Sequence, residues 1–184
     1  MNLKRGTLFL VVGPSGAGKD SLIDGAKAAL ARNNDKHYVF PRRYITRPTE
    51  AGGENHVAVT PEIFEALLKN DDMVLSWQAH NLRYGVPMSV ESHLKAGRSV
   101  VLNVSRTVVD QARIALAPIK VLYITVSDEV LTKRLQDRGR ETVADIQRRV
   151  ARAGEYEISG DDVCVIDNGG KLKASIAAFL KAIG

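Results

Sequence analysis

A glycine-rich loop is the segment of this sequence with the clearest chemical potential. Residues 13–19 are Gly-Pro-Ser-Gly-Ala-Gly-Lys, which fits the pattern G-x-x-x-x-G-K between an apolar run and an amphipathic segment. Glycines let successive backbone N–H groups face phosphate oxygens, the helix N-terminus adds its positive end, and Lys19 reaches the β and γ phosphates. The loop therefore predicts ATP binding by nine residues: Gly13, Pro14, Ser15, Gly16, Ala17, Gly18, Lys19, Asp20 and Ser21.

One position of this loop departs from the usual pattern. The residue after the lysine is commonly a serine or threonine whose hydroxyl binds Mg²⁺, but here it is Asp20, and Ser21 follows it. A carboxylate is a suitable ligand for Mg²⁺, yet acidic residues are also favoured in the first turn of a helix for electrostatic reasons. The sequence predicts a Mg²⁺ site at Asp20 or Ser21 and leaves the choice open.

A cluster of arginines forms the second group of candidate residues. Arg134 and Arg138 are one helical turn apart, and Arg149 follows beyond a glycine-marked bend. Guanidinium groups pair with phosphate oxygens, and a hinged segment can close over substrates and exclude water. We expect Arg138 and Arg149 to be catalytic together with Lys19, within a helical lid of about residues 134–152. The competing interpretation is a solvated helix face.

Bulk composition limits the class of protein. The chain has 184 residues, 45% of them hydrophobic and 26% charged, which predicts a single compact domain. The net charge is +5, but the arginines cluster and aromatic residues make up only 5%, so small phosphorylated ligands explain the charge better than nucleic acid. No run approaches eighteen apolar residues, so no membrane partner is expected. The single cysteine, Cys164, cannot form an internal disulfide; we expect it in the core and the protein in the cytoplasm.

Apolar runs alternate with amphipathic segments along the whole chain. This alternation predicts an α/β fold with three layers and a central parallel sheet, with a core at about 1–36 and 98–184 and a small subdomain at about 37–97. The expected strands are 7–12, 37–46, 73–79, a segment around 84, 98–104, 119–126 and 162–166. The expected helices are 19–32, 62–69, 89–96, 107–116, 127–137, one from 142 and 171–182. Thr60 with Pro61, Ser127, and Thr142 with Asp145 are predicted helix N-terminal signals.

The ordered set of motifs resembles the guanylate kinase family across nearly the whole chain. The segments that carry the resemblance are GPSGAGKDSL (13–22), ITRP (45–48), YG (84–85) and RLQDRGRET (134–142), with Arg149 beyond them. The resemblance implies that Arg134, Arg138 and Arg149 serve ATP and the transition state. It also implies that Arg47 and Tyr84 contact the acceptor phosphate. Together with the glycine-rich loop, the resemblance implies a P-loop kinase fold in which the small subdomain binds the acceptor.

The departures from that family concern the acceptor. A second acceptor arginine of guanylate kinases corresponds to Glu50, a glutamate that contacts guanine corresponds to Ser76, and an aspartate that contacts guanine corresponds to Ser105. Guanine's N–H groups require acceptors, and a site without them discriminates poorly. The phosphate machinery is therefore retained while the base-reading groups are missing.

This combination is similar to the ribose 1,5-bisphosphate phosphokinases of phosphonate degradation, which are relatives of guanylate kinase. The shared segments include GGENH (52–56) and SWQAH (76–80), followed by YGVP (84–87). The resemblance implies transfer from ATP to ribose 1,5-bisphosphate, giving 5-phosphoribosyl 1-diphosphate and ADP. The acceptor-binding residues that it implies are Arg43, Arg47, Glu54, His56, His80 and Tyr84.

Several alternatives stay open from the sequence alone. One is a kinase for GMP or another nucleoside monophosphate, and another is a non-catalytic scaffold with the same fold. Trp77 either lies in the core or packs beside the acceptor, and the core is favoured. His37 and His93 are interpreted as structural or exposed because no histidine pair has metal-ligand spacing. A homodimer is a further possibility on which the sequence does not decide.

Overall fold

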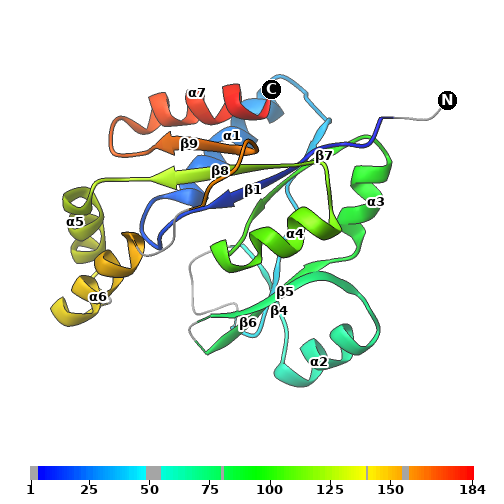
Figure 1. Cartoon of the computed structure of the whole chain (residues 1–184), viewed down its shortest axis with the longest axis horizontal. Helices are drawn as coiled ribbons and strands as arrows, with labels where there is room; N and C mark the ends of the chain where they lie inside the picture. Colours follow the sequence, from blue (N-terminus) through cyan, green and yellow to red (C-terminus); the bar gives the residue numbers. More distant parts are fainter. Residues whose placement is uncertain (1–3, 49–54, 80, 140, 155–157) are drawn as a thin grey trace. The chain divides into compact units, whose positions relative to one another are not determined.

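The computed structural model describes residues 4–48, 55–79, 81–139, 141–154 and 158–184 (Figure 1). A five-stranded sheet has the strand order β2-β7-β1-β8-β9, and a four-stranded sheet has the order β4-β3-β6-β5. Strand β2 pairs parallel with β7, and β8 pairs parallel with β9. The predicted α/β architecture with a central parallel sheet is confirmed. The strands of the first sheet are β1 (Leu8–Val12), β2 (Tyr38–Val39), β7 (Ser99–Asn103), β8 (Ile119–Thr125) and β9 (Val163–Asp167).

The chain divides into two compact units. Unit 1 comprises residues 1–8 and 36–119, and unit 2 comprises residues 9–35 and 120–184. Unit 2 contains helices α1 (Lys19–Arg32), α5 (Asp128–Arg138), α6 (Val143–Gly154) and α7 (Leu172–Ile183). No helix in the described ranges has both the length and the apolar character needed to cross a membrane.

Strand β1 is buried in the sheet, and the helix that follows it, α1, packs against α7. All residues of β1 are buried, as expected for a continuous apolar run in a parallel sheet. Helices α1 and α7 lie side by side, and a Cβ added at Gly25 would lie 2.3 Å from Ile176 Cδ1 (Figure 1). Glycine at this position therefore permits the close approach of the two helices.

Helices α5 and α6 form a pair with its own small core, built from Leu131, Leu135 and Ile146 (Figure 1). The predicted caps of both helices are confirmed. The hydroxyl of Ser127 accepts from Val130 N at 3.3 Å. At the start of α6, Thr142 N donates to Asp145 Oδ2 at 3.3 Å and Asp145 N donates to Thr142 Oγ1 at 3.2 Å, which is a capping box. The start of α6 is thus fixed by local hydrogen bonds.

This capping box gives a prediction for the dependence of stability on pH. The hydrogen bonds from Thr142, followed by the ion pair with Arg148, lower the pKa of Asp145 from 3.8 to about 2. A carboxyl group whose pKa is lower in the folded state stabilises the fold above its unfolded pKa, and this stabilisation is lost as the pH falls through the folded pKa. Wild type should therefore lose more thermal stability than Asp145→Asn between about pH 4 and pH 2.

Thermal unfolding followed by circular dichroism at stepped pH would measure this difference. Thr142→Val keeps the carboxylate and removes its main partner, so its acid-induced loss of stability should be smaller than in wild type and should be complete at a higher pH. Parallel stability profiles for wild type and Asp145→Asn would contradict the assignment.

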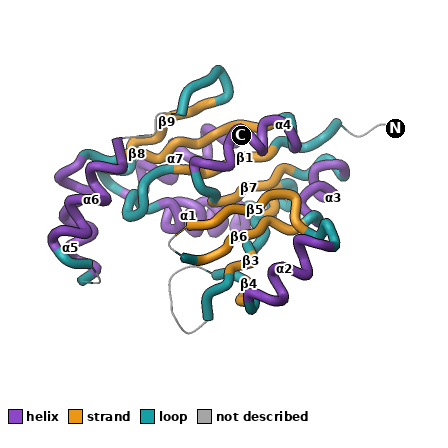
Figure 2. Tube along the Cα trace, turned by 60° about the horizontal axis from the view of Figure 1, so that its bottom comes forward, coloured by secondary structure: helices purple, strands orange, loops and turns teal. Residues whose placement is uncertain are grey.

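Unit 1 is built around the four-stranded sheet (Figure 2). Its strands are β3 (Tyr44–Ile45), β4 (Val57–Ala58), β5 (Met73–Ala79) and β6 (Leu82–Pro87). Its helices are α2 (Pro61–Lys69), α3 (Ser89–Lys95), the 3₁₀ turn η2 (Arg106–Val108) and α4 (Val109–Ala115). The predicted start of α2 is confirmed, since Thr60 Oγ1 accepts from Ile63 N at 3.2 Å and Pro61 follows. Phe64 of α2 is buried, and it approaches Gly85 of β6 closely.

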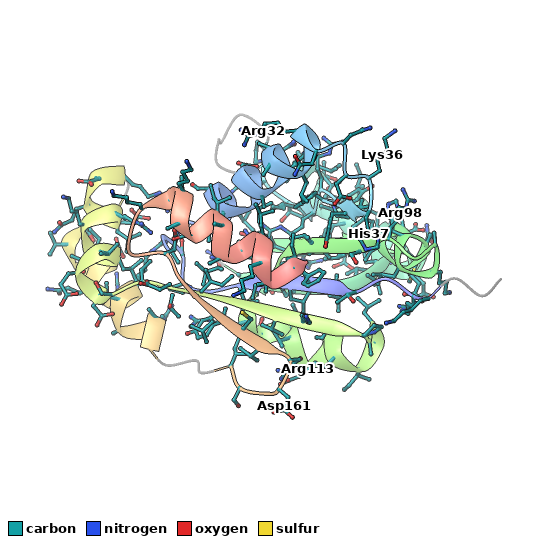
Figure 3. All side chains as sticks on the ribbon, turned by 90° about the horizontal axis from the view of Figure 1, so that it is seen from above. Arg32, Lys36, His37, Arg98, Arg113 and Asp161 are labelled. Atoms are coloured by element: carbon teal, nitrogen blue, oxygen red, sulfur yellow. The ribbon has the colours of Figure 1, made fainter. Side chains whose placement is uncertain are left out.

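Two expectations from the sequence are wrong. The expected strand at 37–46 is two short strands, because β2 joins the five-stranded sheet and β3 the other, with Pro41 between them. Cys164 is exposed on β9 rather than buried in the core, because β9 is the terminal strand of its sheet. His37, expected to be structural or exposed, is exposed, and its Nε2 lies 3.0 Å from Ser99 Oγ (His37 is labelled in Figure 3).

Candidate nucleotide site and acceptor residues

The glycine-rich loop adopts a backbone that only glycine tolerates at three positions. Gly13, Gly16 and Gly18 have φ values of 144°, 98° and 85°. A Cβ added at Gly13 would lie 2.3 Å from Ile124 O, and one at Gly18 would lie 2.5 Å from Asn168 Nδ2. The loop connects β1 directly to α1, so the predicted strand, loop and helix are confirmed. This curled backbone leaves a concave space at the N-terminus of α1, where anions bind favourably.

Lys19 is folded over its own loop. Its Nζ donates to Gly13 O and Pro14 O, both at 2.9 Å. These carbonyl oxygens hold an ammonium group that carries a full positive charge at the mouth of the loop. A phosphate group entering the loop would offer Lys19 a stronger, charged acceptor.

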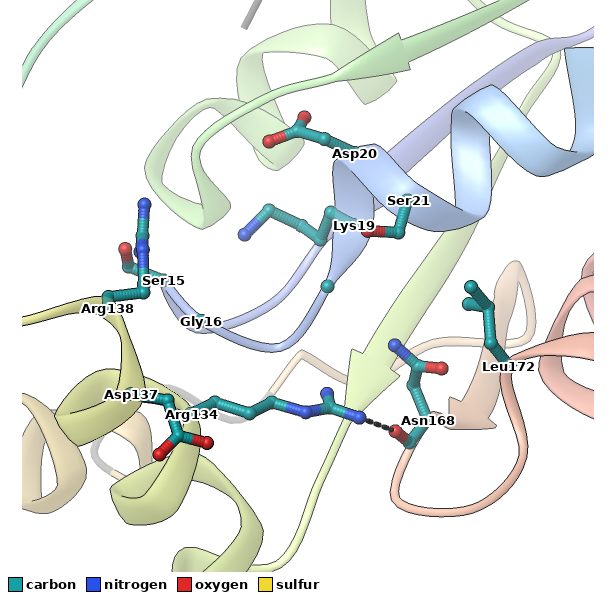
Figure 4. Close-up of a pocket in the computed structure, with 11 residues that line it drawn as sticks. Ser15, Gly16, Lys19, Asp20, Ser21, Arg134, Asp137, Arg138, Asn168 and Leu172 are labelled. Carbon is teal, nitrogen blue, oxygen red and sulfur yellow. Dashed lines mark hydrogen bonds between the residues drawn. The ribbon is translucent and has the colours of Figure 1, made fainter. Parts of the chain in front are cut away.

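A cavity of about 520 Å³ opens in front of the loop within unit 2 (Figure 4). Its lining combines the loop, the start of α1, the end of α5 and the turn after β9. The residues are Ser15, Gly16, Gly18, Lys19, Asp20, Ser21, Arg134, Asp137, Arg138, Asn168 and Leu172. The structure thus brings most of the predicted ATP-binding residues together, Arg134 among them, along with Arg138 of α5.

Arg134 joins three parts of this cavity wall. Its Nη2 donates to Asn168 O at 2.7 Å and its Nη1 donates to Ala17 O at 3.3 Å (Figure 4). Asn168 is 2% exposed, and its Nδ2 donates to Ala17 O at 2.7 Å. The phosphate loop is therefore tied both to α5 and to the turn after β9 through Ala17.

Arg149 reaches the same loop from helix α6. Its Nη1 donates to Ser15 Oγ at 3.2 Å and lies 3.4 Å from Glu141 Oε1. Arg138 lines the cavity with an exposed side chain. Of the predicted catalytic residues, Lys19 and Arg138 line the cavity, and Arg149 contacts its loop.

The residues present fit a nucleoside triphosphate with a bound Mg²⁺. The cavity in front of the loop is lined by the cationic side chains of Lys19, Arg134 and Arg138, which suit phosphate groups. Asp20 and Ser21 are both exposed on the cavity wall, so either can offer a hard oxygen ligand. Within the described ranges no three His, Cys, Asp or Glu side chains form a metal-binding group. Mg²⁺ at phosphate sites usually has only one or two carboxylate ligands, together with phosphate oxygens and water.

The predicted acceptor residues lie in unit 1, where three of the described side chains form a stack. The rings of Trp77 and Tyr84 are stacked with centroids 5.3 Å apart and an interplanar angle of 6°. The guanidinium carbon of Arg43 lies 5.7 Å from both ring centroids, and Arg43 is 8% exposed. Trp77, expected in the core, is half-buried and packs on Tyr84 across β5 and β6. The stack fixes the position of the Tyr84 ring and of the Arg43 charge.

Two further predicted acceptor residues, Arg47 and His56, are in contact near the end of β3. His56 is buried, and its Nε2 lies 2.9 Å from Arg47 O. This contact couples the two residues through the backbone of Arg47. Glu54 and His80 lie outside the described residues, as does Glu50.

Comparison with known proteins places the chain in a family. The sequence profile of guanylate kinase matches residues 5–175. The chain belongs to the guanylate kinase family. A solved guanylate kinase from Anaplasma phagocytophilum has a TM-score of 0.70 and 15% identity, and the match covers 100% of this chain and 87% of that chain. This similarity shows the guanylate kinase fold.

Two curated relatives are more similar in sequence. A ribose 1,5-bisphosphate phosphokinase of Agrobacterium fabrum is 44% identical over 167 residues, which is 90% of this chain and 90% of the relative. The bifunctional ribose 1,5-bisphosphokinase-thymidine phosphorylase of Cupriavidus necator is 44% identical over 178 residues. That match covers 97% of this chain but only 29% of the relative, so the chain spans less than a third of the bifunctional protein.

Within this guanylate kinase fold, the two serines predicted to replace base-reading carboxylates are both in unit 1. Ser76 lies on β5 opposite Gly85, and it is half-buried. Ser105 precedes η2, where its Oγ accepts from Thr107 Oγ1 at 2.9 Å and caps the turn. Neither position supplies the anionic acceptor that a guanine edge requires.

Sequence reasoning missed two residues of the nucleotide unit. Asn168 follows the last strand in the run Asp167-Asn168-Gly169-Gly170, where two glycines after a strand indicate a tight turn but not its position beside the phosphate loop. No sequence pattern identified Glu141, because its partner Arg149 is eight residues away and no motif links positions that far apart. Both residues were recognisable only from their contacts.

Proposed function

We propose that this chain transfers the γ-phosphoryl group of ATP to ribose 1,5-bisphosphate, giving ADP and 5-phosphoribosyl 1-diphosphate. The observation that carries the proposal is the 44% identity to a ribose 1,5-bisphosphate phosphokinase over nine-tenths of both chains. Two observations support it: the glycine-rich loop, Arg134 and Arg138 line one cavity, and Ser76 and Ser105 are neutral at the two positions where carboxylates are expected to contact guanine.

The reaction needs positioning and charge neutralisation rather than proton transfer. An oxygen of the acceptor's C1 phosphate forms the new bond to the γ-phosphorus, and the bond from that phosphorus to the β–γ bridging oxygen breaks, so ADP leaves. The acceptor oxygen is already anionic at neutral pH, and no general base is required. Lys19 holds the β and γ phosphates, while Arg138 and Arg149 neutralise charge on the transferring group. Bound Mg²⁺, with Asp20 or Ser21 as its protein ligand, would neutralise charge on the same phosphates.

Acceptor binding is assigned to unit 1. Arg43 and Arg47 supply cations for the sugar phosphates, Tyr84 supplies a hydroxyl, and His56 is held beside Arg47. A sugar with phosphates at both ends needs several such groups and no base pocket. Glu54 and His80 stay predictions of the same acceptor site. We likewise propose that the chain is one domain, in which residues 37–97 form the acceptor-binding subdomain and residues 134–152 form the lid.

Phosphorus NMR of the purified chain with MgATP tests the function directly. Separate samples would contain ribose 1,5-bisphosphate, GMP or no acceptor. We expect a new diphosphate signal at the sugar C1 only in the first sample. GDP in the second sample would assign the chain to the GMP kinases, and no product in any sample would favour a scaffold.

Two further proposals concern the cellular location and the oligomeric state of the protein. We propose a cytoplasmic location and assembly into a homodimer. Light scattering of the purified chain gives its mass in solution, and a monomer at all concentrations would refute the homodimer.

A further inference from the structure

Glu141 is a buried carboxylate that the mechanism above does not use. Its side chain is 10% exposed, and Oε1 lies 3.4 Å from Arg149 Nη1. The other oxygen, Oε2, is shielded from solvent and has no hydrogen-bond partner among the residues that the structure describes. Burial of a carboxylate is costly unless it is paired and hydrogen-bonded. Its contact with Arg149 is therefore the interaction that can offset this cost.

The fold fixes the position of this carboxylate. Glu141 directly precedes the Thr142–Asp145 capping box, whose hydrogen bonds define the first turn of α6. Arg149 lies about two helical turns further along the same helix. Long side chains on a helix lean towards its N-terminus, so the Arg149 guanidinium is directed back towards Glu141. Their pairing follows from the geometry of α6.

Arg149 is also the contact between α6 and the phosphate loop. The same Nη1 that faces Glu141 Oε1 donates to Ser15 Oγ at 3.2 Å. A chain of contacts therefore runs from Glu141 through Arg149 to Ser15 of the loop. An arginine has five N–H donors, so an arginine held at Nη1 still has several donors for a phosphoryl group.

We propose that Glu141 is a positioning residue for Arg149. It holds the guanidinium over the phosphate loop before ATP is bound, and its second oxygen can accept another N–H of Arg149 when the lid adjusts to the substrate. An arginine that is positioned in advance stabilises the developing charge without a further loss of side-chain conformational entropy. The inference rests on the role of Arg149 in the proposed function.

A role in positioning predicts a particular kinetic pattern. Glu141→Gln keeps the size of the side chain and removes its charge, so kcat should fall about 10-fold while the KM for ATP changes less than about threefold. Glu141→Asp keeps the charge and should recover part of the loss. Glu129→Gln is the matched control, since it makes the same change at an exposed position in the first turn of α5, and its kcat should stay at the wild-type value.

A double-mutant cycle separates positioning from a structural effect. If Glu141 acts through Arg149, Glu141→Gln should lower kcat in wild type and cause almost no further loss in the Arg149→Met background. An equal fold-loss in both backgrounds would overturn the proposal. A lowered unfolding temperature with unchanged kcat would also overturn it, because the carboxylate would then only stabilise the lid.

A binding measurement keeps this test independent of the acceptor. ADP with Mg²⁺ and aluminium fluoride mimics the transferring phosphoryl group, and calorimetry can compare its affinity with that of MgADP alone. Glu141→Gln should weaken the binding of the mimic about 10-fold more than the binding of MgADP, and only when Arg149 is present. If wild type phosphorylates no acceptor, the proposed function fails, yet this selective weakening still supports the pairing. Equal weakening of both ligands refutes it.

Discussion

Replacing Lys19 with methionine should lower the rate of phosphoryl transfer at least about 100-fold while the chain stays folded. Methionine has a similar length but no charge, so it cannot interact with the β and γ phosphates as an ammonium does. The loop should keep its shape, because Ala17 O still accepts from Arg134 and Asn168 on the other side of the loop. Turnover of MgATP with ribose 1,5-bisphosphate measures the loss, and circular dichroism verifies the fold.

Lys27→Met is the matched control for this variant. Lys27 lies on the same helix with an exposed side chain, so the change removes an equal charge away from the cavity. We expect its turnover to stay at the wild-type value. A Lys19→Met protein that retained more than about five per cent of wild-type turnover would contradict the role of the lysine.

The nucleotide site was predictable because its signals are local. The glycine spacing of the loop specifies positive φ angles, and those angles are observed at Gly13, Gly16 and Gly18. The capping box at Thr142 and Asp145 likewise depends on residues three positions apart. Where a few neighbouring residues determine a backbone, a single sequence is sufficient to identify it.

Contacts between distant segments were not predictable in the same way. Asn168 reaches Ala17 across 151 positions, and Arg134 reaches the same carbonyl across 117. No periodicity connects such residues, and only the parallel pairing of β8 with β9 brings the turn after β9 to the loop. The predicted burial of Cys164 was wrong for a related reason. An apolar run in the sequence does not show whether its strand is central or at the edge of a sheet.

The acceptor residues show where a family resemblance adds to physical reasoning. Spacing alone gave no reason to group Arg43 with Trp77 and Tyr84, which lie on three different segments. The structure stacks these three side chains, and this agrees with Arg43 and Tyr84 acting together but not with a fully buried Trp77. The sequence identified the residue types, and the sheet pairing of β5 with β6 supplied their neighbours.

Replacing Arg149 with methionine should lower kcat about 100- to 1,000-fold and change the KM for ATP much less. Arg149 contacts the loop through Ser15 Oγ. We expect its charge to matter most in the transition state, when negative charge spreads over the transferring phosphoryl group. Steady-state kinetics with varied ATP and saturating acceptor separate the two constants. Arg149→Lys should recover little, because an ammonium cannot pair with Glu141 and a phosphoryl group through a planar fork.

The neighbouring Arg148 provides the control that makes this result interpretable. It lies on the same helix with an exposed side chain, and its Nη2 pairs with Asp145 Oδ1 at 2.5 Å. Because Arg148→Met removes the same charge from α6 but no contact with the loop, kcat should stay within about twofold of wild type. Equal losses in both variants would mean that the general positive charge of α6 assists the reaction. A large loss confined to Arg149→Met would mean that one guanidinium, positioned by its contacts, stabilises the transition state.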